Sequence, residues 1–308
     1  MIKLKISINP DEILSNKARH DKTVSNSLKE LADLVPNHKS DDFKSRLWKK
    51  FKLVIWEQQH KKCAFCEKEI VSSDDAQLEH FRPKAEACSE DDVHITREAY
   101  WWLAYDHKNF IVSCFTCNNI KGNRFPLQDE ETRVTATDLD GVVKLTEVGS
   151  LGNEMPLLIN PRYQDPEPYL AYDYRPDIRI VHVVPKDDNG IGEKTINILD
   201  LNRLGKNKDE FRDNLTNKRG NVLSEFKKEL ENFNLLKKEL TKHRENSVLY
   251  PNNTDAKKVV DDMEINLNSK RDKIRGRFLL DRAQFSGMCS FWLKNDSDLE
   301  NDLIEAAA

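Results

Sequence analysis

The sequence has no long apolar segment and no feature of a secretion signal. It contains no run of about 18 apolar residues, the length at which a membrane-spanning helix becomes a candidate. The N-terminus is not signal-like. We therefore expect a cytoplasmic chain that neither spans a membrane nor is secreted.

An ATP-binding loop and an excess of positive charge are also absent. The pattern G-x-x-x-x-G-K-[ST] does not occur, so nothing indicates that this chain hydrolyses ATP. The 53 Asp and Glu residues outnumber the 49 Lys and Arg residues, which gives a net charge of -4. A nucleic-acid-binding protein of this composition must gather its positive charge in a local patch.

Cysteine is present, and its spacing is informative. Six cysteines occur, and four of them form two C-x-x-C pairs: Cys63, Cys66, Cys114 and Cys117. Disulfide frameworks are typical of small secreted domains, so this pattern favours a metal site in a chain of 308 residues. Two such pairs can hold one tetrahedral Zn²⁺ with no open position, which makes the site structural. Cys88 and Cys289 are expected to be free thiols.

Further residues with metal and acid–base chemistry lie between and after these pairs. The first pair is followed by Glu79-His80-Phe81-Arg82-Pro83-Lys84 and then by Tyr100-Trp101-Trp102 and Asn109, while the second runs into Asn118 and Lys121-Gly122-Asn123-Arg124. This order resembles the zinc-knuckled HNH endonucleases, which have a ββα-metal fold. Within them it is similar to the HNH subunits, called PtuB, of Septu and related retron anti-phage systems. The resemblance covers roughly residues 50–215 and is strongest over 63–127.

The resemblance implies an α+β fold, with a zinc-knuckled ββα-metal HNH core and a mainly α-helical C-terminal region. It also implies that Glu79 and Asn118 bind a catalytic metal and that Asn109 orients the base. The chemistry of the residues agrees, because neutral His80 can accept a proton near pH 7 and carboxylate and amide oxygens suit Mg²⁺ or Mn²⁺. Asn123 is a rival or additional ligand, since it lies five residues after Asn118 on the same expected helix.

Four basic residues near this centre are candidates for contact with nucleic-acid phosphates: Arg82, Lys84, Lys121 and Arg124. Each could equally be a solvated surface charge. The same two interpretations apply to the Lys-rich amphipathic helix that the periodicity predicts over 42–59. The aromatic run Tyr100–Tyr105 is expected to pack in the core, with stacking on nucleobases as the alternative.

Four segments are expected along the chain. Residues 1–62 hold a strand at 1–8, a helix near 25–34 and the basic helix, and residues 63–127 form the HNH module. Residues 128–190 form a β- and Pro-rich connector with a hairpin at 130–148 and a strand at 178–184. Residues 191–305 form the helical region, with helices at 195–204, 207–245 and 255–292. The last two make a helical hairpin, which is either a packing scaffold or a surface on which a partner docks.

The sequence therefore predicts a metal-dependent HNH endonuclease that cleaves phosphodiester bonds, with DNA favoured over RNA as its substrate. The alternative is a non-catalytic zinc-ribbon module that binds nucleic acid or a protein, although such a module needs neither Glu79-His80 nor Asn118. The resemblance implies an anti-phage complex in which a separate, PtuA-like ATPase subunit restrains or positions the nuclease. We expect that subunit to dock on the connector 156–185 or on the helical hairpin.

Overall fold

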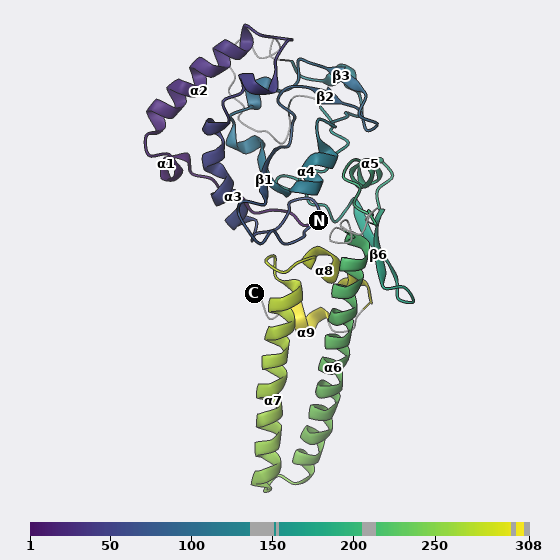
Figure 1. Ribbon diagram of the computed structural model, residues 1–308. Helices are drawn as coiled ribbons and strands as arrows, with labels where there is room; N and C mark the ends of the chain where they lie inside the picture. The colour runs from purple at the N-terminus through teal and green to yellow at the C-terminus, as the bar shows by residue number, and fades with distance from the viewer. Residues whose placement is uncertain (136–150, 152–153, 205–213, 297–299, 305–308) are drawn as a thin grey trace. The chain divides into compact units, whose positions relative to one another are not determined.

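The computed structural model describes residues 1–135, 151, 154–204, 214–296 and 300–304 (Figure 1). The chain divides into two compact units. One is formed by Met1–Ala171 with Val183–Arg203, and the other by Tyr172–His182 with Leu204–Ala308. Helices alternate with three small antiparallel sheets of two strands each in the described part. This mixture confirms the expected α+β class.

The first unit consists of short helices and strands joined by irregular segments. Its α-helices are α1 (Pro10–Ile13), α2 (Lys17–Ala32), α3 (Lys52–Gln58), α4 (Phe115–Lys121) and α5 (Ile191–Ile198). Its strands are β1 (Ala76–His80), β2 (Ala87–Cys88), β3 (His94–Thr96) and β4 (Phe110–Cys114), and the hairpin of β5 (Leu170–Arg175) and β6 (Ile180–Pro185) belongs in part to each unit. The chain also forms 3-10 helices at Ser40–Asp42, Ser45–Leu47, Lys49–Phe51, Trp101–Leu103, His107–Asn109 and Glu130–Thr132.

Two strands and one helix of the first unit form a strand–strand–helix arrangement. β1 pairs antiparallel with β4, so that Ala76 lies opposite Cys114 and His80 lies opposite Phe110. Every residue of β4 is buried, as the nearly continuous apolar run Phe110–Val112 predicts for an interior strand. Helix α4 starts directly after β4. The pairing therefore brings the N-terminal end of β1 beside the start of α4, and α4 then runs back along β1 so that Asn118 and Lys121 reach Glu79.

The aromatic run after β3 belongs to the core. Tyr100, Trp101 and Trp102 are buried, and the rings of Tyr100 and Trp102 lie 5.6 Å apart. The ring of Phe125 approaches Tyr100 edge-on, with ring centroids 5.4 Å apart. The expected core packing is confirmed, and the burial of these faces removes the basis for stacking on nucleobases.

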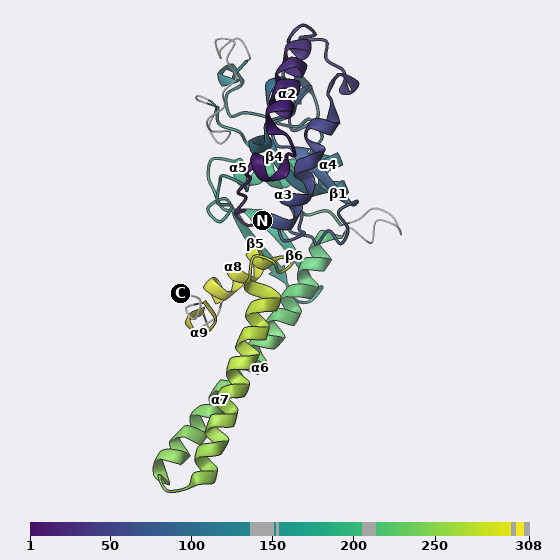
Figure 2. The same cartoon turned by 90° about the vertical axis from the view of Figure 1, so that its left-hand side faces the viewer.

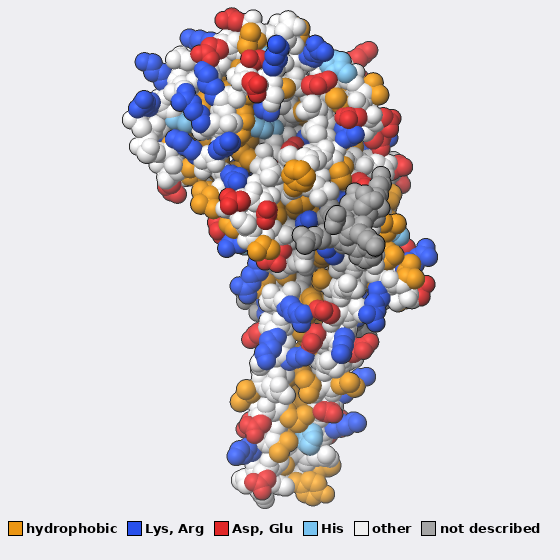
Figure 3. Space-filling model, viewed as in Figure 1, with side chains coloured by type: hydrophobic (Ala, Val, Ile, Leu, Met, Phe, Trp, Pro, Cys, Tyr) orange, Lys and Arg blue, Asp and Glu red, His pale blue; other side chains and the backbone are white. Residues whose placement is uncertain are grey.

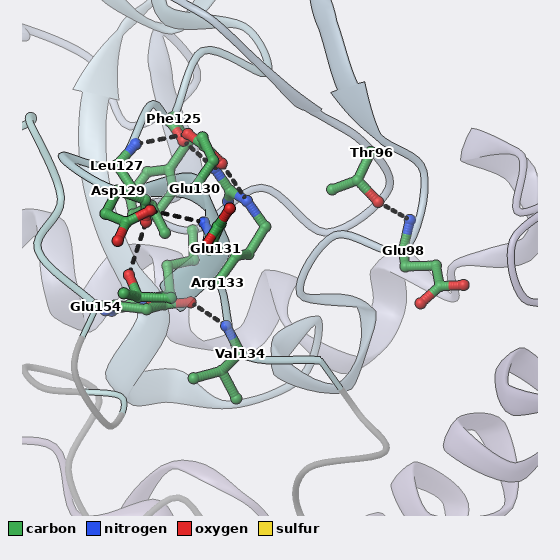
Figure 4. Close-up of polar contacts among 12 residues, drawn as sticks. Thr96, Glu98, Phe125, Leu127, Asp129, Glu130, Glu131, Arg133, Val134 and Glu154 are labelled. Atoms are coloured by element: carbon green, nitrogen blue, oxygen red, sulfur yellow. Dashed lines mark hydrogen bonds and ion pairs between the residues drawn. The ribbon is translucent and has the colours of Figure 1, made fainter.

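A buried carboxylate organises the chain on both sides of this aromatic core. Glu154 accepts hydrogen bonds from the hydroxyl of Tyr100 (2.8 Å), the backbone N–H of Val134 (2.8 Å) and Nε of Arg82 (3.2 Å). Figure 4 shows Glu154 directed at Val134, with Arg133 lying beside Glu130. A buried charge with three donors is well compensated. Glu154 therefore fixes Arg82 and Tyr100 as parts of one rigid core.

Several expected elements of the first unit differ from the structure. The predicted helix 42–59 is α-helical only in α3, because His20 Nε2 contacts Leu47 O, the acceptor that Phe51 N would use in an α-helix, and Phe51 N donates to Trp48 O instead. Residues 1–8 form no strand, although Leu4 N donates to Pro161 O at 2.7 Å. The helix expected at 195–204 is α5 and ends at Ile198. Most of the hairpin predicted at 130–148 lies outside the described residues.

The second unit is dominated by a pair of long helices. α6 (Leu215–Leu249) and α7 (Thr254–Ile274) run antiparallel side by side, as Figures 1 and 2 both show. Phe226, Phe233 and Leu240 form the buried stripe of α6. The predicted helical hairpin is confirmed. The helix expected over 255–292 is interrupted by a π-helical turn at Arg275–Leu279, and α8 (Ser286–Asp296) and α9 (Glu300–Ile304) follow.

No helix in the described part of the chain combines the length and the apolar character that a membrane crossing requires.

Candidate metal centres and active site

The four cysteines of the C-x-x-C pairs meet in one buried cluster. The Sγ atoms of Cys63, Cys66, Cys114 and Cys117 all lie within 4.8 Å of one another, and those of Cys66 and Cys114 are 3.9 Å apart. Four sulfurs bound tetrahedrally at about 2.3 Å from one Zn²⁺ are separated by roughly 3.8 Å. The donor set and its spacing therefore fit a structural zinc. It is the one cluster of three or more His, Cys, Asp or Glu ligands among the described residues.

Backbone geometry explains why the sulfurs converge. The first pair lies on a tight turn, where Cys63 N donates to Lys68 O (2.9 Å) and Glu67 N donates to Cys63 O (3.0 Å). Ala64 N donates to Val112 O of β4 at 2.9 Å, which fixes this turn against the central strands. Cys114 ends β4 and caps α4, so the first turn of α4 brings Cys117 to the same side. Helix and strand together hold the second pair.

A distant arginine completes the environment of the cluster. Nη2 of the buried Arg203 donates to Cys117 Sγ at 3.5 Å. Hydrogen bonds from the other three thiols lower the pKa of Cys66, and the positive charge of Arg203 acts in the same direction. A four-thiolate zinc site carries an excess of negative charge, which a buried guanidinium partly offsets. No local sequence pattern marks Arg203 as part of the zinc environment, because 86 residues separate it from Cys117.

Glu79 of β1 faces two side chains of α4. Glu79 Oε2 accepts a hydrogen bond from Asn118 Nδ2, and Oε1 lies 2.6 Å from Nζ of Lys121. Burial raises the pKa of Glu79, and the ammonium of Lys121 opposes that shift. The structure thus brings together the two residues expected to bind the catalytic metal. A carboxylate and an amide oxygen are a donor set suited to Mg²⁺ or Mn²⁺, which keeps several waters and uses phosphate oxygens as further ligands.

His80 is held in one orientation at the end of β1. Its Nε2 lies 2.9 Å from the carbonyl oxygen of Ala104, and its ring lies edge-on to Trp48 (4.9 Å between centroids) and Phe110 (5.1 Å). A carbonyl can only accept, so Nε2 carries the proton and Nδ1 keeps the lone pair. Burial, reinforced by the charge of Lys84, lowers the pKa of His80 from 6.5 to about 3. The imidazole is therefore neutral at pH 7.

Asn109 fixes the chain that follows His80. Its Oδ1 accepts from Arg82 N and its Nδ2 donates to Arg82 O, both at 2.9 Å. Phe81 N also donates to Asn109 O at 2.9 Å. The side chain is fully buried. This arrangement suits the positioning role implied by the resemblance, since Asn109 sets the path of the backbone directly after His80.

The four expected phosphate contacts have different environments. Arg82 is buried against Glu154, and Lys121 is buried against Glu79. Arg124 pairs with Asp92 at 3.2 Å and donates from Nε to Glu90 O at 3.0 Å. Lys84 lies over the rings of Phe43 (5.2 Å) and Trp48 (5.6 Å), near the edge of the site. Of these four, Lys84 is the one that lies beside His80 and forms no ion pair with a described residue.

The placement of Asn123 differs from the sequence-based expectation. α4 ends at Lys121, and Gly122 adopts a φ of 49°, which turns the chain away from the helix. Asn123 therefore does not share a helical face with Asn118, and its backbone oxygen accepts from Cys88 N at 2.9 Å instead. The prediction that both residues lie on one helix was wrong, because glycine terminated the helix one turn early. Cys88 and Cys289 are buried free thiols, as expected.

Exposed basic residues gather near the site on another segment. Arg46, Lys49 and Lys50 are exposed on the two 3-10 helices that flank Trp48, and none of them forms an ion pair with a described residue. Trp48 itself contacts the ring of His80. The adjoining helix α2 is tied to this segment, because His20 Nε2 lies 3.0 Å from Leu47 O. Figure 3 shows Lys and Arg side chains gathered over the α2 side of the first unit.

Two curated proteins are similar to this chain. Septu protein PtuB of Bacillus mycoides (strain KBAB4) is 33% identical over 143 residues, which are 46% of this chain and 43% of PtuB. Septu protein PtuA of the same strain is 29% identical over 145 residues, which are 46% of this chain and 18% of PtuA. The chain thus matches less than half the length of either relative. No family model and no solved structure matches it. A relation to Septu proteins is thereby shown, as the motifs predicted.

Proposed function

We propose that the chain is a metal-dependent HNH-type nuclease that hydrolyses phosphodiester bonds, with His80 as general base and Glu79 and Asn118 as ligands of Mg²⁺ or Mn²⁺. The observation that carries this proposal is the contact between Glu79 of β1 and Asn118 of α4, with His80 the next residue of β1 after Glu79. The four-cysteine cluster lies at the other end of the same β1–β4 pair, where Ala76 faces Cys114. A structural zinc there would brace the pair that holds the cutting centre.

The residues can divide the work of hydrolysis between them. A bound Mg²⁺ or Mn²⁺ would polarise the scissile phosphate and stabilise charge on the leaving oxygen. His80 offers the lone pair of Nδ1 to a water molecule, while its Nε2–H stays on Ala104 O. A phosphate beside the ring raises the pKa of His80 above its value in the free protein, because negative charge favours the imidazolium. Asn109 keeps the backbone after His80 in place.

The substrate is approached through the basic segment around Trp48. Arg82 and Lys121 are buried, so long-range attraction of a phosphate backbone depends on exposed cations such as Arg46, Lys49 and Lys50. Lys84 lies between this segment and His80, over the ring of Trp48. These cations would lead a nucleic-acid strand to the base. DNA remains the favoured substrate over RNA, and the test below distinguishes them.

The similarity to Septu proteins supports a place in an anti-phage defence complex. One relative is a PtuB protein and the other a PtuA protein, so both components of that system have sequence in common with this chain. We propose that a separate PtuA-like ATPase subunit binds this chain and controls its cutting. The α6–α7 hairpin offers an exposed apolar end for that contact, with Val248, Leu249 and Tyr250 exposed by 78%, 70% and 66%.

One observation favours the alternative of a non-catalytic zinc module. The carboxylate of Glu79 is already paired with the ammonium of Lys121, so the structure satisfies this acid without a divalent ion. In that case the chain would bind nucleic acid or a protein through the basic segment and cut nothing. Cutting assays separate the two functions.

The test uses the zinc-loaded full chain, alone and with its ATPase subunit, on plasmid DNA and on total RNA. Wild type, His80→Ala and His80→Asn are compared with Mg²⁺, with Mn²⁺ and with EDTA, and zinc content is measured after each treatment. His94→Ala is the matched control, because His94 is exposed and pairs with Glu86 away from the site. We expect wild type and the control to cut and both His80 variants to lose at least about a hundredfold in rate. Absence of cutting by zinc-loaded wild type under every condition would reject the nuclease.

A further inference from the structure

Lys121 is the most deeply buried charged side chain beside the candidate active site. It lies on the last turn of α4, and its side chain is 0% exposed. Its Nζ is 2.6 Å from Glu79 Oε1, 3.3 Å from His80 O and 3.5 Å from Gly122 O. An ammonium is stable away from water only where such oxygens replace its hydration. Two oxygens from β1 and one from Gly122, directly after α4, thus form a cation site that Lys121 fills.

The oxygens around Lys121 are those that a divalent ion would use. Hard ions such as Mg²⁺ and Mn²⁺ bind carboxylate and carbonyl oxygens, and the carboxylate here is that of Glu79. Its other oxygen, Oε2, accepts from the amide of Asn118. Side chains of α4 therefore engage both oxygens of the acid. A divalent ion that approaches Glu79 meets a positive charge already in contact with it.

We propose that Lys121 is a built-in cation that competes with the catalytic metal for Glu79, so that metal loading requires the ammonium to leave Oε1. This inference rests on the proposed function, in which Glu79 is a metal ligand. Two cations close to one buried carboxylate repel each other strongly, because the surroundings screen charge poorly. The free protein therefore holds Mg²⁺ or Mn²⁺ weakly. Lys121 is in this sense a positioning residue that keeps the Glu79 carboxylate oriented while the metal is absent.

In this proposal, the phosphate of the substrate releases the ammonium of Lys121 from Glu79. A phosphodiester adds negative charge to the site and offers the ammonium an alternative oxygen partner. It also supplies further ligands to the metal. Nucleic acid and metal then bind with positive coupling, since each favours the arrangement that the other needs. Lys121 would thereby contact phosphate, as the sequence suggested, but only after it has given up Glu79.

The experiment measures Mn²⁺ binding to zinc-loaded full chain without nucleic acid, from the electron paramagnetic resonance signal of free Mn²⁺. Lys121→Met removes the charge at similar length, and Lys121→Gln keeps a hydrogen-bond donor should the first variant fold poorly. We expect either variant to bind one Mn²⁺ at least about tenfold more tightly than wild type. Glu79→Gln should abolish this binding in wild-type and Lys121→Met backgrounds alike. Lys238→Met, at an exposed position on α6, is the matched control and should leave the affinity unchanged.

Thermal unfolding gives a second readout that requires no cutting. Lys121→Met leaves the buried Glu79 without its counter-charge, so its melting temperature should fall and Mn²⁺ should raise it more than in wild type. The double variant Glu79→Gln with Lys121→Met lacks both charges and should regain stability. Equal or weaker Mn²⁺ affinity in folded, zinc-loaded Lys121 variants overturns the inference, even if wild type cuts DNA and the nuclease stands. Tighter Mn²⁺ binding with no cutting by any protein supports the inference and rejects the nuclease.

Discussion

The imidazole of His80 donates its Nε2 hydrogen to the carbonyl oxygen of Ala104, 2.9 Å away. This contact selects one tautomer of a ring that is also packed between Trp48 and Phe110. The proton-accepting nitrogen, Nδ1, is thereby defined before any substrate binds. A general base that is oriented in advance loses little entropy in the reaction.

The tautomer can be observed directly. In zinc-loaded protein at pH 7, we expect the ¹⁵N spectrum of His80 to show a neutral ring with its proton on Nε2. The reason is that the carbonyl of Ala104 can only accept a hydrogen bond and burial disfavours the charged ring. His94, which is exposed, provides an internal comparison. A His80 signal with the proton on Nδ1 would contradict the proposed role of that nitrogen.

Replacement of Asn109 by Ala should destabilise the first unit. The substitution leaves the backbone N–H and C=O of Arg82 buried without their partners, which costs about 2–4 kcal/mol. Equilibrium unfolding by urea measures the loss. Asn119→Ala is the matched control, because Asn119 is exposed on α4 and should change stability by less than about 0.5 kcal/mol. Equal stability of the two variants would show that the Asn109 side chain does not hold this backbone.

Zinc should be retained less firmly when Arg203 is changed. We expect one zinc per chain, and we expect Arg203→Met to release it several-fold faster to a chromogenic chelator, because outer-shell partners of metal ligands contribute about 10- to 100-fold to metal affinity. The exposed Arg175 offers the control Arg175→Met. An unchanged rate of zinc release from Arg203→Met would show that this guanidinium does not contribute to zinc affinity. Complete zinc removal should unfold the turn and strands that the cysteines join.

The stability of the protein should decline in mild acid partly through His107. Burial, with help from the charges of Arg162 and Lys108, lowers the pKa of His107 from 6.5 to about 4. Between pH 6.5 and pH 4, His107 is therefore protonated in the unfolded chain and neutral in the folded chain. The contribution of His107 is therefore complete above pH 6.5 and is lost as the pH falls towards 4.

The variant His107→Gln isolates this contribution, because it cannot take up the proton. Relative to wild type, it should gain on the order of 2 kcal/mol of unfolding free energy between pH 7.5 and pH 4.5. Urea unfolding at the two pH values measures the difference, and effects of acid on the cysteines cancel in the comparison. A difference that stays constant with pH would mean that His107 titrates alike in both states.

Affinity for nucleic acid should depend on the exposed cations beside Trp48. Substitution of Arg46, Lys49 and Lys50 by Ser should weaken binding of a labelled duplex and lower the slope of log affinity against log salt by up to about three. Lys242, Lys257 and Lys258 are equally exposed on α6 and α7, and their triple Ser variant is the control. Equal salt slopes for the two variants would locate the phosphate contacts elsewhere.

The chemistry of the candidate site was more predictable from the sequence than its electrostatics. The cysteine cluster was predictable because a tetrahedral ion needs paired sulfurs at short spacing. The structure brings together the four residues concerned, Cys63, Cys66, Cys114 and Cys117. Glu79 and Asn118 also meet as expected. For Lys121 the sequence left two interpretations, a phosphate contact or a solvated surface charge, since a basic motif does not show which of its residues points inward.

Long-range partners and broken helices explain the remaining differences. Arg203 reaches Cys117 across 86 residues, and Glu154 reaches Arg82 across 72, so no local pattern reports either contact. The apolar spacing of Phe43, Leu47 and Phe51 correctly marked a buried face. It could not show that the backbone between them forms short 3-10 helices, because apolar spacing indicates which side chains are buried and not which backbone hydrogen bonds form.

The side chain of Asn109 has the same groups, at nearly the same separation, as a peptide unit. By accepting from Arg82 N and donating to Arg82 O, it adds one further rung to the β1–β4 ladder after the strand itself has ended. The backbone N–H and C=O of Arg82 are thus hydrogen-bonded even though β4 begins only at Phe110. Gln would overshoot and Asp would lose the donor, so Asn fits this position better than either. An evolving sequence can vary the loops on either side of this rung, but it cannot easily replace the rung.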